Sequence, residues 1–277
     1  MTLDRNWLLG VARAEREALG RTVQYTPPER WEAESPREGW RLRDVVAHLA
    51  ASEAAAASVI ADETPSELDE YTKSLDDPRE LTSDGFNDWA VARRADAPVL
   101  SLASEWGKSA DALLVQAAET GDEDWRKREL RWMTEELPVG YLLQTRVCQW
   151  WVHGEDIRAG ALLPPRMEHP PIFSVNDLAV RLIPYALGRG GKTFKGKSVL
   201  IELEAVGEGT WHQGLQAGYE PPKEKQPDAI IVGRAHAFAL VASRRADVDL
   251  CLYDGILNMG GDLEIADAVL HNVRAFV

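Results

Sequence analysis

The sequence predicts an α+β protein in which a helical bundle precedes a smaller domain of mixed helices and strands. Nine of the ten tryptophans lie at or before Trp151, in a half that is rich in alanine and leucine at helical spacing. The second half contains segments typical of strands, such as KSVLIELEAV and DAIIVG. Because the proline-rich connector LLPPRMEHPP separates the halves, we place the domain boundary near residue 165 and expect domains at 1–165 and 166–277.

Four helices are expected in the first half, because apolar residues repeat there at intervals of three and four. Their expected ranges are about 3–20, 41–62, 83–120 and 138–160. Pro98 is expected to kink or restart the third helix, and Pro138 is a residue type favoured in the first turn of a helix. Four long amphipathic helices joined by long connections favour a four-helix bundle.

The second half mixes helices and strands along the chain. We expect a helix near 174–187, strands near 198–206, 209–215 and 228–233, a helix at RAHAFALVASRR, a strand at VDLCLYDG, and a last helix near 262–276. This order predicts a small α+β domain.

The overall charge limits the classes of partner. A net charge of −14 repels phosphate backbones and anionic membranes, so we expect neither nucleic acid nor a membrane as a partner. Cys148 and Cys251 are far apart and lie in apolar runs, which favours a reducing compartment over a disulfide framework. The N-terminus lacks the pattern of a signal peptide, and no run of eighteen apolar residues is present. We therefore expect a cytoplasmic protein, as a monomer or weak homodimer.

One segment imitates a phosphate-binding loop. GKTFKGKS, residues 191–198, matches glycine, four residues and Gly-Lys-Ser. That chemistry requires a strand before the loop and a helix after it, so that backbone amides at the helix N-terminus face the phosphate. Here an expected helix precedes the segment and an expected strand follows it. We interpret it as a basic turn.

Three polar side chains are expected to meet inside the bundle. His48 borders the apolar stripe of the helix near 41–62. Gln149 and His153 are four residues apart in VCQWWVHGEDIR, so they share one face of the helix near 138–160. If these two helices face each other, the three side chains converge, and bundles often build metal sites in this way. Three protein ligands with an open position are typical of catalytic zinc, and imidazole also suits nickel, iron and copper.

Each of these residues also has a purely structural interpretation. A core histidine is commonly just hydrogen-bonded to a neighbour, and a pair of polar residues four apart arises by chance. Trp150 and Trp151 are expected to pack the core, with one of them walling a pocket. Asp156, three residues beyond His153, can hydrogen-bond a ligating imidazole and fix its tautomer.

Two N-terminal segments and one C-terminal segment resemble a known family. GWRLRDVVAHLAASE and QWWVHGEDIRAGAL resemble the second and fourth helices of the mycothiol-dependent maleylpyruvate isomerases, whose N-terminal domain is a DinB-like four-helix bundle. DAIIVGRAHAFALVASRRADVDLCLYDG resembles the sterol-carrier-like C-terminal domain of many members. The chain looks closer to an uncharacterised actinobacterial branch than to the characterised isomerases. The resemblance implies a DinB-like bundle followed by a sterol-carrier-like α+β domain.

The resemblance also implies a chemistry. A divalent metal, usually zinc, would be held at positions 48, 149 and 153 and would activate the thiol of mycothiol, which is then deprotonated. An arginine of the C-terminal domain would hold a substrate carboxylate. Our candidate catalytic residues are Arg244, Arg245 and Asp156, and the candidate cofactor-binding residues are Arg158 and Trp150; for the three arginines the alternative is a solvated helix end.

Gln149 departs from the family pattern, which has glutamate at this position. A neutral amide oxygen is a poorer zinc ligand than a carboxylate, but it leaves the metal more cationic and a stronger Lewis acid. Three functions stay open. The first is a metal-dependent, mycothiol-using isomerase or S-transferase acting on a small electrophile; the second is a non-catalytic small-molecule binding protein with a degenerate metal site; the third is a regulatory role for a degenerate enzyme.

Overall fold

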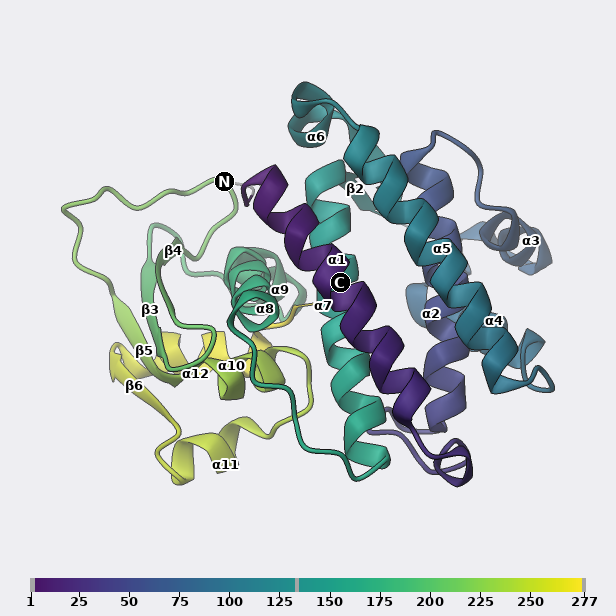
Figure 1. The fold of residues 1–277 in the computed structure, drawn as a ribbon. Coiled ribbons are helices and arrows are strands. Elements are labelled where there is room, and N and C mark those ends of the chain that lie inside the picture. The colour runs from purple at the N-terminus through teal and green to yellow at the C-terminus, as the bar shows by residue number, and fades with distance from the viewer. Residues whose placement is uncertain (1–2, 133–134, 276–277) are drawn as a thin grey trace. The chain divides into compact units, whose positions relative to one another are not determined.

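The computed structural model describes residues 3–132 and 135–275, and the chain divides into two compact units, Met1–Pro165 and Arg166–Val277 (Figure 1). The first unit is helical apart from one small hairpin, and the second combines a four-stranded sheet with helices. The predicted α+β fold class is therefore confirmed.

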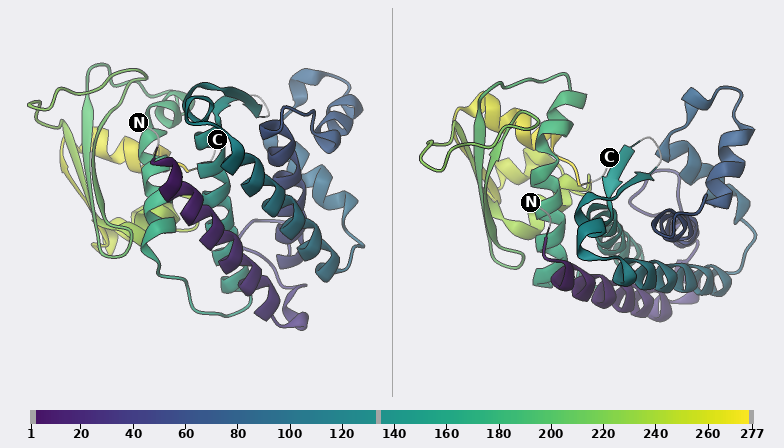
Figure 2. Two further views of the ribbon diagram at one scale, coloured as in Figure 1. Left: turned by 45° about the horizontal axis from the view of Figure 1, so that its top comes forward. Right: turned by 90° about the horizontal axis from the view of Figure 1, so that it is seen from above.

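The four long helices of the first unit form a bundle. α1 (Arg5–Tyr25) packs against α7 (Val139–Gly160), and α2 (Leu42–Ile60) packs against α5 (Val99–Glu119), as Figure 1 and the two views in Figure 2 show. α2 also contacts α7 directly. The shorter elements are η1 (Pro28–Arg30), α3 (Ser66–Ser74), η2 (Pro78–Glu80), α4 (Ser83–Arg93), α6 (Asp122–Lys127), and the antiparallel strands β1 (Glu129–Trp132) and β2 (Glu135–Pro138).

The single helix predicted over 83–120 is two helices, α4 and α5. Thr82 begins α4, since its side chain accepts a hydrogen bond from the amide of Gly85. Pro98 precedes α5 as its N-cap, with extended backbone. A proline disfavours helical backbone at the residue before it, so the chain leaves one helix and starts another. The predicted effect of Pro98 is thus confirmed as a restart.

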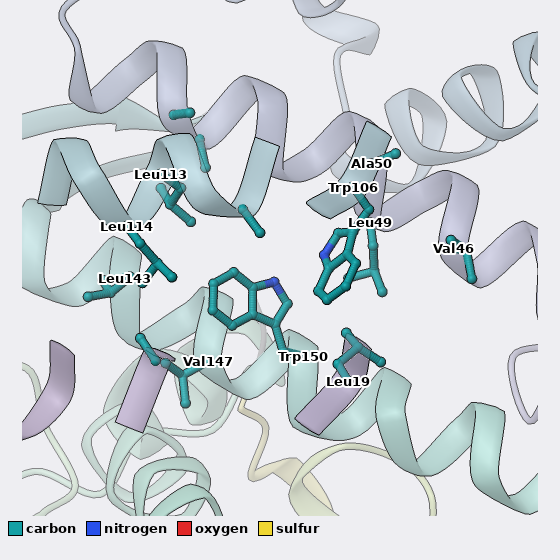
Figure 3. Close-up of a cluster of buried hydrophobic side chains, with 14 of the residues drawn as sticks. Leu19, Val46, Leu49, Ala50, Trp106, Leu113, Leu114, Leu143, Val147 and Trp150 are labelled. Atoms are coloured by element: carbon teal, nitrogen blue, oxygen red, sulfur yellow. The ribbon is translucent and has the colours of Figure 1, made fainter. Parts of the chain in front are cut away.

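The core of the bundle is packed around tryptophans and leucines (Figure 3). Trp150 of α7 and Trp106 of α5 meet edge to face, with their ring centroids 6.5 Å apart. Trp150 is fully buried, and Leu19, Leu143 and Val147 are drawn around it in Figure 3. Burying a large side chain contributes roughly 1.5–3 kcal/mol, so these contacts hold α1, α5 and α7 together.

The second unit places a four-stranded sheet against helices. Its strand order is β4-β3-β5-β6, with β3 and β5 parallel and both outer pairs antiparallel. Val199, Ile201 and Leu203 of β3 are buried while Glu202 and Glu204 are exposed, so the sheet buries one face. The elements are α8 (His169–Arg181), α9 (Ile183–Arg189), β3 (Ser198–Glu204), β4 (Gly209–Gly214), β5 (Ala229–Arg234), α10 (Ala235–Ala242), α11 (Val248–Tyr253), β6 (Leu257–Gly261) and α12 (Leu263–Asn272).

The strand predicted at VDLCLYDG is wrong, because this segment forms α11. The alternation of Val248, Leu250 and Leu252 suggested a strand, but the buried residues are Val248 and Cys251, which have helical spacing. Asp247 caps the helix by accepting a hydrogen bond from the amide of Leu250. The edge strand comes later, as β6, after a turn at Gly255 whose φ of 68° suits glycine.

The basic segment 191–198 follows helix α9 and leads into strand β3, so the predicted order, a helix before it and a strand after it, is confirmed. Within residues 3–132 and 135–275, no helix is long and apolar enough to cross a membrane.

The contacts of Asp228 with Lys197 and Lys225 should make the stability of the second unit depend on pH in the acid range. Burial raises the pKa of Asp228, but hydrogen bonds from Lys197 and Lys225 outweigh it and hold the pKa well below its usual value. A carboxyl with a lowered folded-state pKa stabilises the fold above its unfolded pKa of about 4, and this stabilisation is lost as the pH falls further. Asp228→Asn should therefore cost about 1–3 kcal/mol at pH 7, and the difference from the native chain should shrink below pH 4.

Native-state hydrogen exchange of the β3 amides measures this effect. Glu204→Gln is the control, because the ion pair of Glu204 with Arg234 is exposed and should contribute less than about 1 kcal/mol. A difference between the native chain and Asp228→Asn that stays constant from pH 7 to pH 2 would contradict the assignment.

Two glycines of α7 should respond oppositely to alanine. A Cβ added at Gly154 would lie 3.7 Å from Leu19, an ordinary contact, so Gly154→Ala should stabilise the helix by about 0.5–1 kcal/mol. A Cβ at Gly140 would lie 2.5 Å from the Trp125 indole nitrogen, which is fully buried, so Gly140→Ala should destabilise by about 1–3 kcal/mol. Denaturant unfolding measures both changes; equal effects of the two substitutions would refute the packing described here.

Candidate metal centre

Two imidazoles meet inside the first unit, one from α2 and one from α7. The ring centroids of His48 and His153 are 5.1 Å apart, and the ring planes meet at 74°. The two residues are only 5% and 6% exposed. The convergence of α2 and α7 at these positions brings together two histidines that are more than a hundred residues apart in the chain.

Each ring uses its Nδ1 atom toward a neighbour on its own helix. His153 Nδ1 lies 2.9 Å from Asp156 Oδ2, and His48 Nδ1 lies 3.3 Å from Ser52 Oγ. A carboxylate only accepts hydrogen bonds, so Nδ1 of neutral His153 carries the hydrogen and Nε2 carries the lone pair. Asp156 is 1% exposed, and it therefore holds the ring from a fixed position.

Gln149 adds a carbonyl oxygen to this group. It lies one helical turn before His153, and its Oε1 atom is buried without a hydrogen-bond partner among the residues described. The Gln149 side chain lies near His48 and opposes the lowering of the His48 pKa, although its Oε1 atom has no donor in hydrogen-bond geometry. A buried carbonyl without a donor costs free energy, so this oxygen is suited to a further group.

The electrostatic surroundings keep His48 neutral. Burial lowers the pKa of His48 well below its ordinary value of 6.5, and the charges of His153 and Arg146 lower it further. A neutral imidazole is the form that binds a metal ion. His48 thus presents a lone pair for coordination at neutral pH.

The residues present fit a divalent metal. An imidazole bound at about 2.1 Å places its ring centroid about 3.2 Å from a zinc ion, so two rings at a tetrahedral angle have centroids about 5 Å apart. The observed 5.1 Å matches this spacing. Asp156 on the outer nitrogen of His153 is the arrangement common around metal-bound histidine. The third candidate ligand is the amide oxygen of Gln149. Within residues 3–132 and 135–275, no group of three or more His, Cys, Asp or Glu side chains is placed to hold a metal ion.

An aromatic group borders His48. The Trp40 ring centroid is 5.3 Å from that of His48. The Arg37 guanidinium carbon lies over the Trp40 ring, 4.0 Å from its centroid. The Trp40 indole N–H donates to Asp88 at 3.1 Å, which fixes the ring. Trp40 therefore limits the access of water to the His48 ring.

A buried ion pair that was not among the predicted site residues lies near His48. Arg146 Nε of α7 lies 3.4 Å from Glu53 Oε2 of α2, with side-chain exposures of 4% and 0%. Arg146 precedes Gln149 by three residues and His153 by seven, so helical spacing alone places it on the same face. That spacing was the signal available in the sequence.

Two further candidates of the first unit have local roles. Trp150 is fully buried in the apolar core against Trp106. Arg158 donates from Nε to the carbonyl of Pro164 at 2.6 Å and from Nη1 to Thr22 Oγ1 at 3.4 Å, so it ties down the end of α7. Their assignment to cofactor binding stays a prediction.

The two candidate arginines of the second unit follow α10. Arg244 has a φ of 61°, in the left-handed region, and its guanidinium donates to the carbonyl of His271 at 3.3 Å. Arg245 donates to the carbonyl of Ser243 at 2.8 Å. Their catalytic role is likewise still a prediction.

A family profile matches just over half of the chain. The profile is that of the mycothiol maleylpyruvate isomerase N-terminal domain, and it matches residues 12–158. This range contains His48, Gln149, His153 and Asp156.

Whole-chain relatives and structures extend the comparison. An uncharacterised protein of Mycobacterium tuberculosis, found in strains H37Rv and CDC 1551, is 27% identical over 236 residues and covers 84% of each chain. The crystal structure of a mycothiol-dependent maleylpyruvate isomerase superposes with a TM-score of 0.58 and that of a mutant of it with 0.59, each at 17% identity over 88% of this chain and 90% of the other. These structures show a shared fold.

The contact of Asp156 with His153 predicts a tautomer. In metal-free protein, neutral His153 should carry its hydrogen on Nδ1, and Asp156→Ala should raise the share of the Nε2-protonated form, since the acceptor is lost. Long-range nitrogen–proton NMR correlation measures both forms, and Ser52→Ala is the control that should leave His153 unchanged. Nε2-protonated His153 in the native chain would show that Asp156 does not orient the ring.

Proposed function

The chain belongs to the family of the mycothiol maleylpyruvate isomerase N-terminal domain, and on this premise we propose that it is a metal-dependent, mycothiol-using isomerase or S-transferase acting on a small electrophilic substrate. The observation that carries the proposal is the approach of His48 and His153, with the unpartnered carbonyl of Gln149 beside them. These side chains would hold a divalent metal, and we propose zinc, because histidine nitrogen and side-chain oxygen are common zinc ligands.

The bound metal would supply one thing: a thiol that coordinates to it loses its proton and becomes a nucleophile. The residues of this chain do the rest. His48 presents a neutral imidazole, Asp156 fixes the orientation of His153, and Trp40 shields the centre from water. Burial strengthens every electrostatic interaction in such a site, because little water screens it.

Gln149 adjusts the charge of the proposed centre. An amide carbonyl brings no negative charge, so a metal held by two imidazoles and an amide keeps its full +2 charge. Such a centre binds a thiolate more strongly and holds the metal itself less strongly than a centre with a carboxylate. Both consequences follow from the one substitution of an amide for an acid.

Other parts of the proposal rest on the sequence. Arg244 and Arg245 are proposed to hold a substrate carboxylate, and Arg158 and Trp150 to contribute to the thiol site. The acidic net charge of −14 supports a protein without nucleic-acid or membrane partners. We further propose a cytoplasmic monomer or weak homodimer; the free, buried Cys148 and Cys251 fit a reducing compartment.

The second candidate function is non-catalytic binding of a small molecule. Gln149 favours it, because the loss of a carboxylate ligand is the change expected in a degenerate metal site. The two candidates differ in metal content: a binding protein would be isolated with a retained ligand and without metal.

The metal content of tag-free protein tests the proposal. We expect about one zinc per chain after loading, and His48→Ala or His153→Ala should lower zinc affinity by more than the roughly 10–100-fold typical of losing an outer-shell partner. Gln149→Glu should raise the affinity, because it adds a negative ligand. Inductively coupled plasma mass spectrometry and competition with a chelator measure these changes.

His271→Ala is the matched control, since His271 is exposed and lies in the second unit. It should leave zinc affinity unchanged. If the native chain binds no zinc and the Gln149→Glu variant does, the result would contradict the metal-dependent enzyme and support the non-catalytic binding protein.

A further inference from the structure

Arg146 is a buried cation with incomplete hydrogen bonding. The residue is 3% exposed, and neither its Nε nor its Nη2 atom has a hydrogen-bond partner among the residues described. Its contact with Glu53 is an ion pair at 3.4 Å, and both Glu53 oxygens also lack hydrogen bonds. A guanidinium has five N–H donors, and leaving buried donors unsatisfied is costly. The pair is therefore arranged for a further partner.

A second buried arginine of the same unit, Arg94, has hydrogen-bond partners for its guanidinium. Arg94 is 9% exposed and donates to Glu105, to Glu67 and to the carbonyl of Ala90. Arg94 links α4 to neighbouring elements and has the bonds that such a role requires. Arg146 has an ion pair with Glu53, but its Nε and Nη2 atoms lack such bonds, so part of its hydrogen-bonding capacity is left unused.

The position of Arg146 relates it to the candidate metal centre. It lies on the face of α7 that carries Gln149 and His153, and its charge acts on His48. The Trp132 ring lies 5.4 Å from the guanidinium carbon and supports it. Arg146 is thus a cation beside a centre whose third ligand, Gln149, is neutral.

We propose that Arg146 is an anion-binding residue of the candidate metal centre, which takes the carboxylate of a small organic acid while Glu53 serves as its counter-ion when no anion is bound. The inference rests on the proposed function, because it assigns an anion-binding residue to that same site. A guanidinium binds a carboxylate through two parallel N–H donors, which gives the substrate a fixed orientation.

Glu53 can replace the bound anion as the partner of Arg146, so anion binding is reversible. Burial raises the pKa of Glu53, and the charge of Arg146 opposes the rise. When an incoming carboxylate pairs with the guanidinium, the charge of Arg146 no longer stabilises ionised Glu53, and the protonated form of Glu53 becomes more favourable. Glu53 therefore competes with the ligand for one cation, and weakening it should strengthen ligand binding.

Calorimetric titration with succinate, in metal-free and in zinc-loaded protein, tests the proposal. The native chain should bind succinate but not the neutral diamide succinamide. Glu53→Gln should bind succinate several-fold more tightly, since the competing carboxylate is gone. The double variant Glu53→Gln/Arg146→Met should bind succinate about 10–100-fold more weakly than Glu53→Gln, which is the scale of a lost charge-assisted hydrogen bond. The double variant leaves no unpaired charge buried, so it should fold, and circular dichroism verifies this.

The pair Arg94→Met/Glu105→Gln is the matched control, and it should leave succinate affinity unchanged. Native protein that does not bind succinate, or equal succinate affinity in Glu53→Gln and the double variant, would overturn the role of Arg146. The zinc measurement is independent: a chain without zinc that still binds succinate through Arg146 would reject the proposed enzyme and retain the anion site.

Discussion

The approach of one imidazole from α2 to another from α7 is the constraint on which the candidate site depends. The rings of His48 and His153 lie 5.1 Å apart because both helices are held by the apolar core of the bundle, in which Trp150 and Trp106 pack edge to face. The same helix α7 thus supplies core packing on one face and polar groups on another. Its apolar face fixes the position of the polar one.

The polar groups between α2 and α7 are costly to bury, which argues that they serve a function. His48, Gln149 and Arg146 bring uncharged nitrogens, a carbonyl without a donor and an incompletely paired cation into one region. A fold selected only for stability would place apolar side chains there, because unsatisfied buried polar groups destabilise it. A metal ion and an anionic ligand are the two kinds of partner that would satisfy these groups.

Periodicity was sufficient for α1, α2 and α7, since the spacing around Val45 and Val46 or around Gln149 and His153 is local information. The segments predicted as single helices at 83–120 and 174–187 each form two helices. Periodicity failed at VDLCLYDG, where a two-residue alternation competes with the capping Asp247, and only the burial of Cys251 shows which period prevails. It also missed Glu53 and Arg146, because a buried ion pair depends on which helices face each other. A charged residue on a helix is normally expected to face solvent, and only the packing of α2 against α7 shows that Glu53 and Arg146 are buried.

Anomalous diffraction from a crystal of the zinc-loaded chain, collected on both sides of the zinc absorption edge, would locate the bound ion. We expect one strong peak between the imidazoles of His48 and His153, within bonding distance of Nε2 of each ring and of the Gln149 carbonyl. An ordered crystal with no peak between these rings, or with zinc held by other side chains, would contradict it.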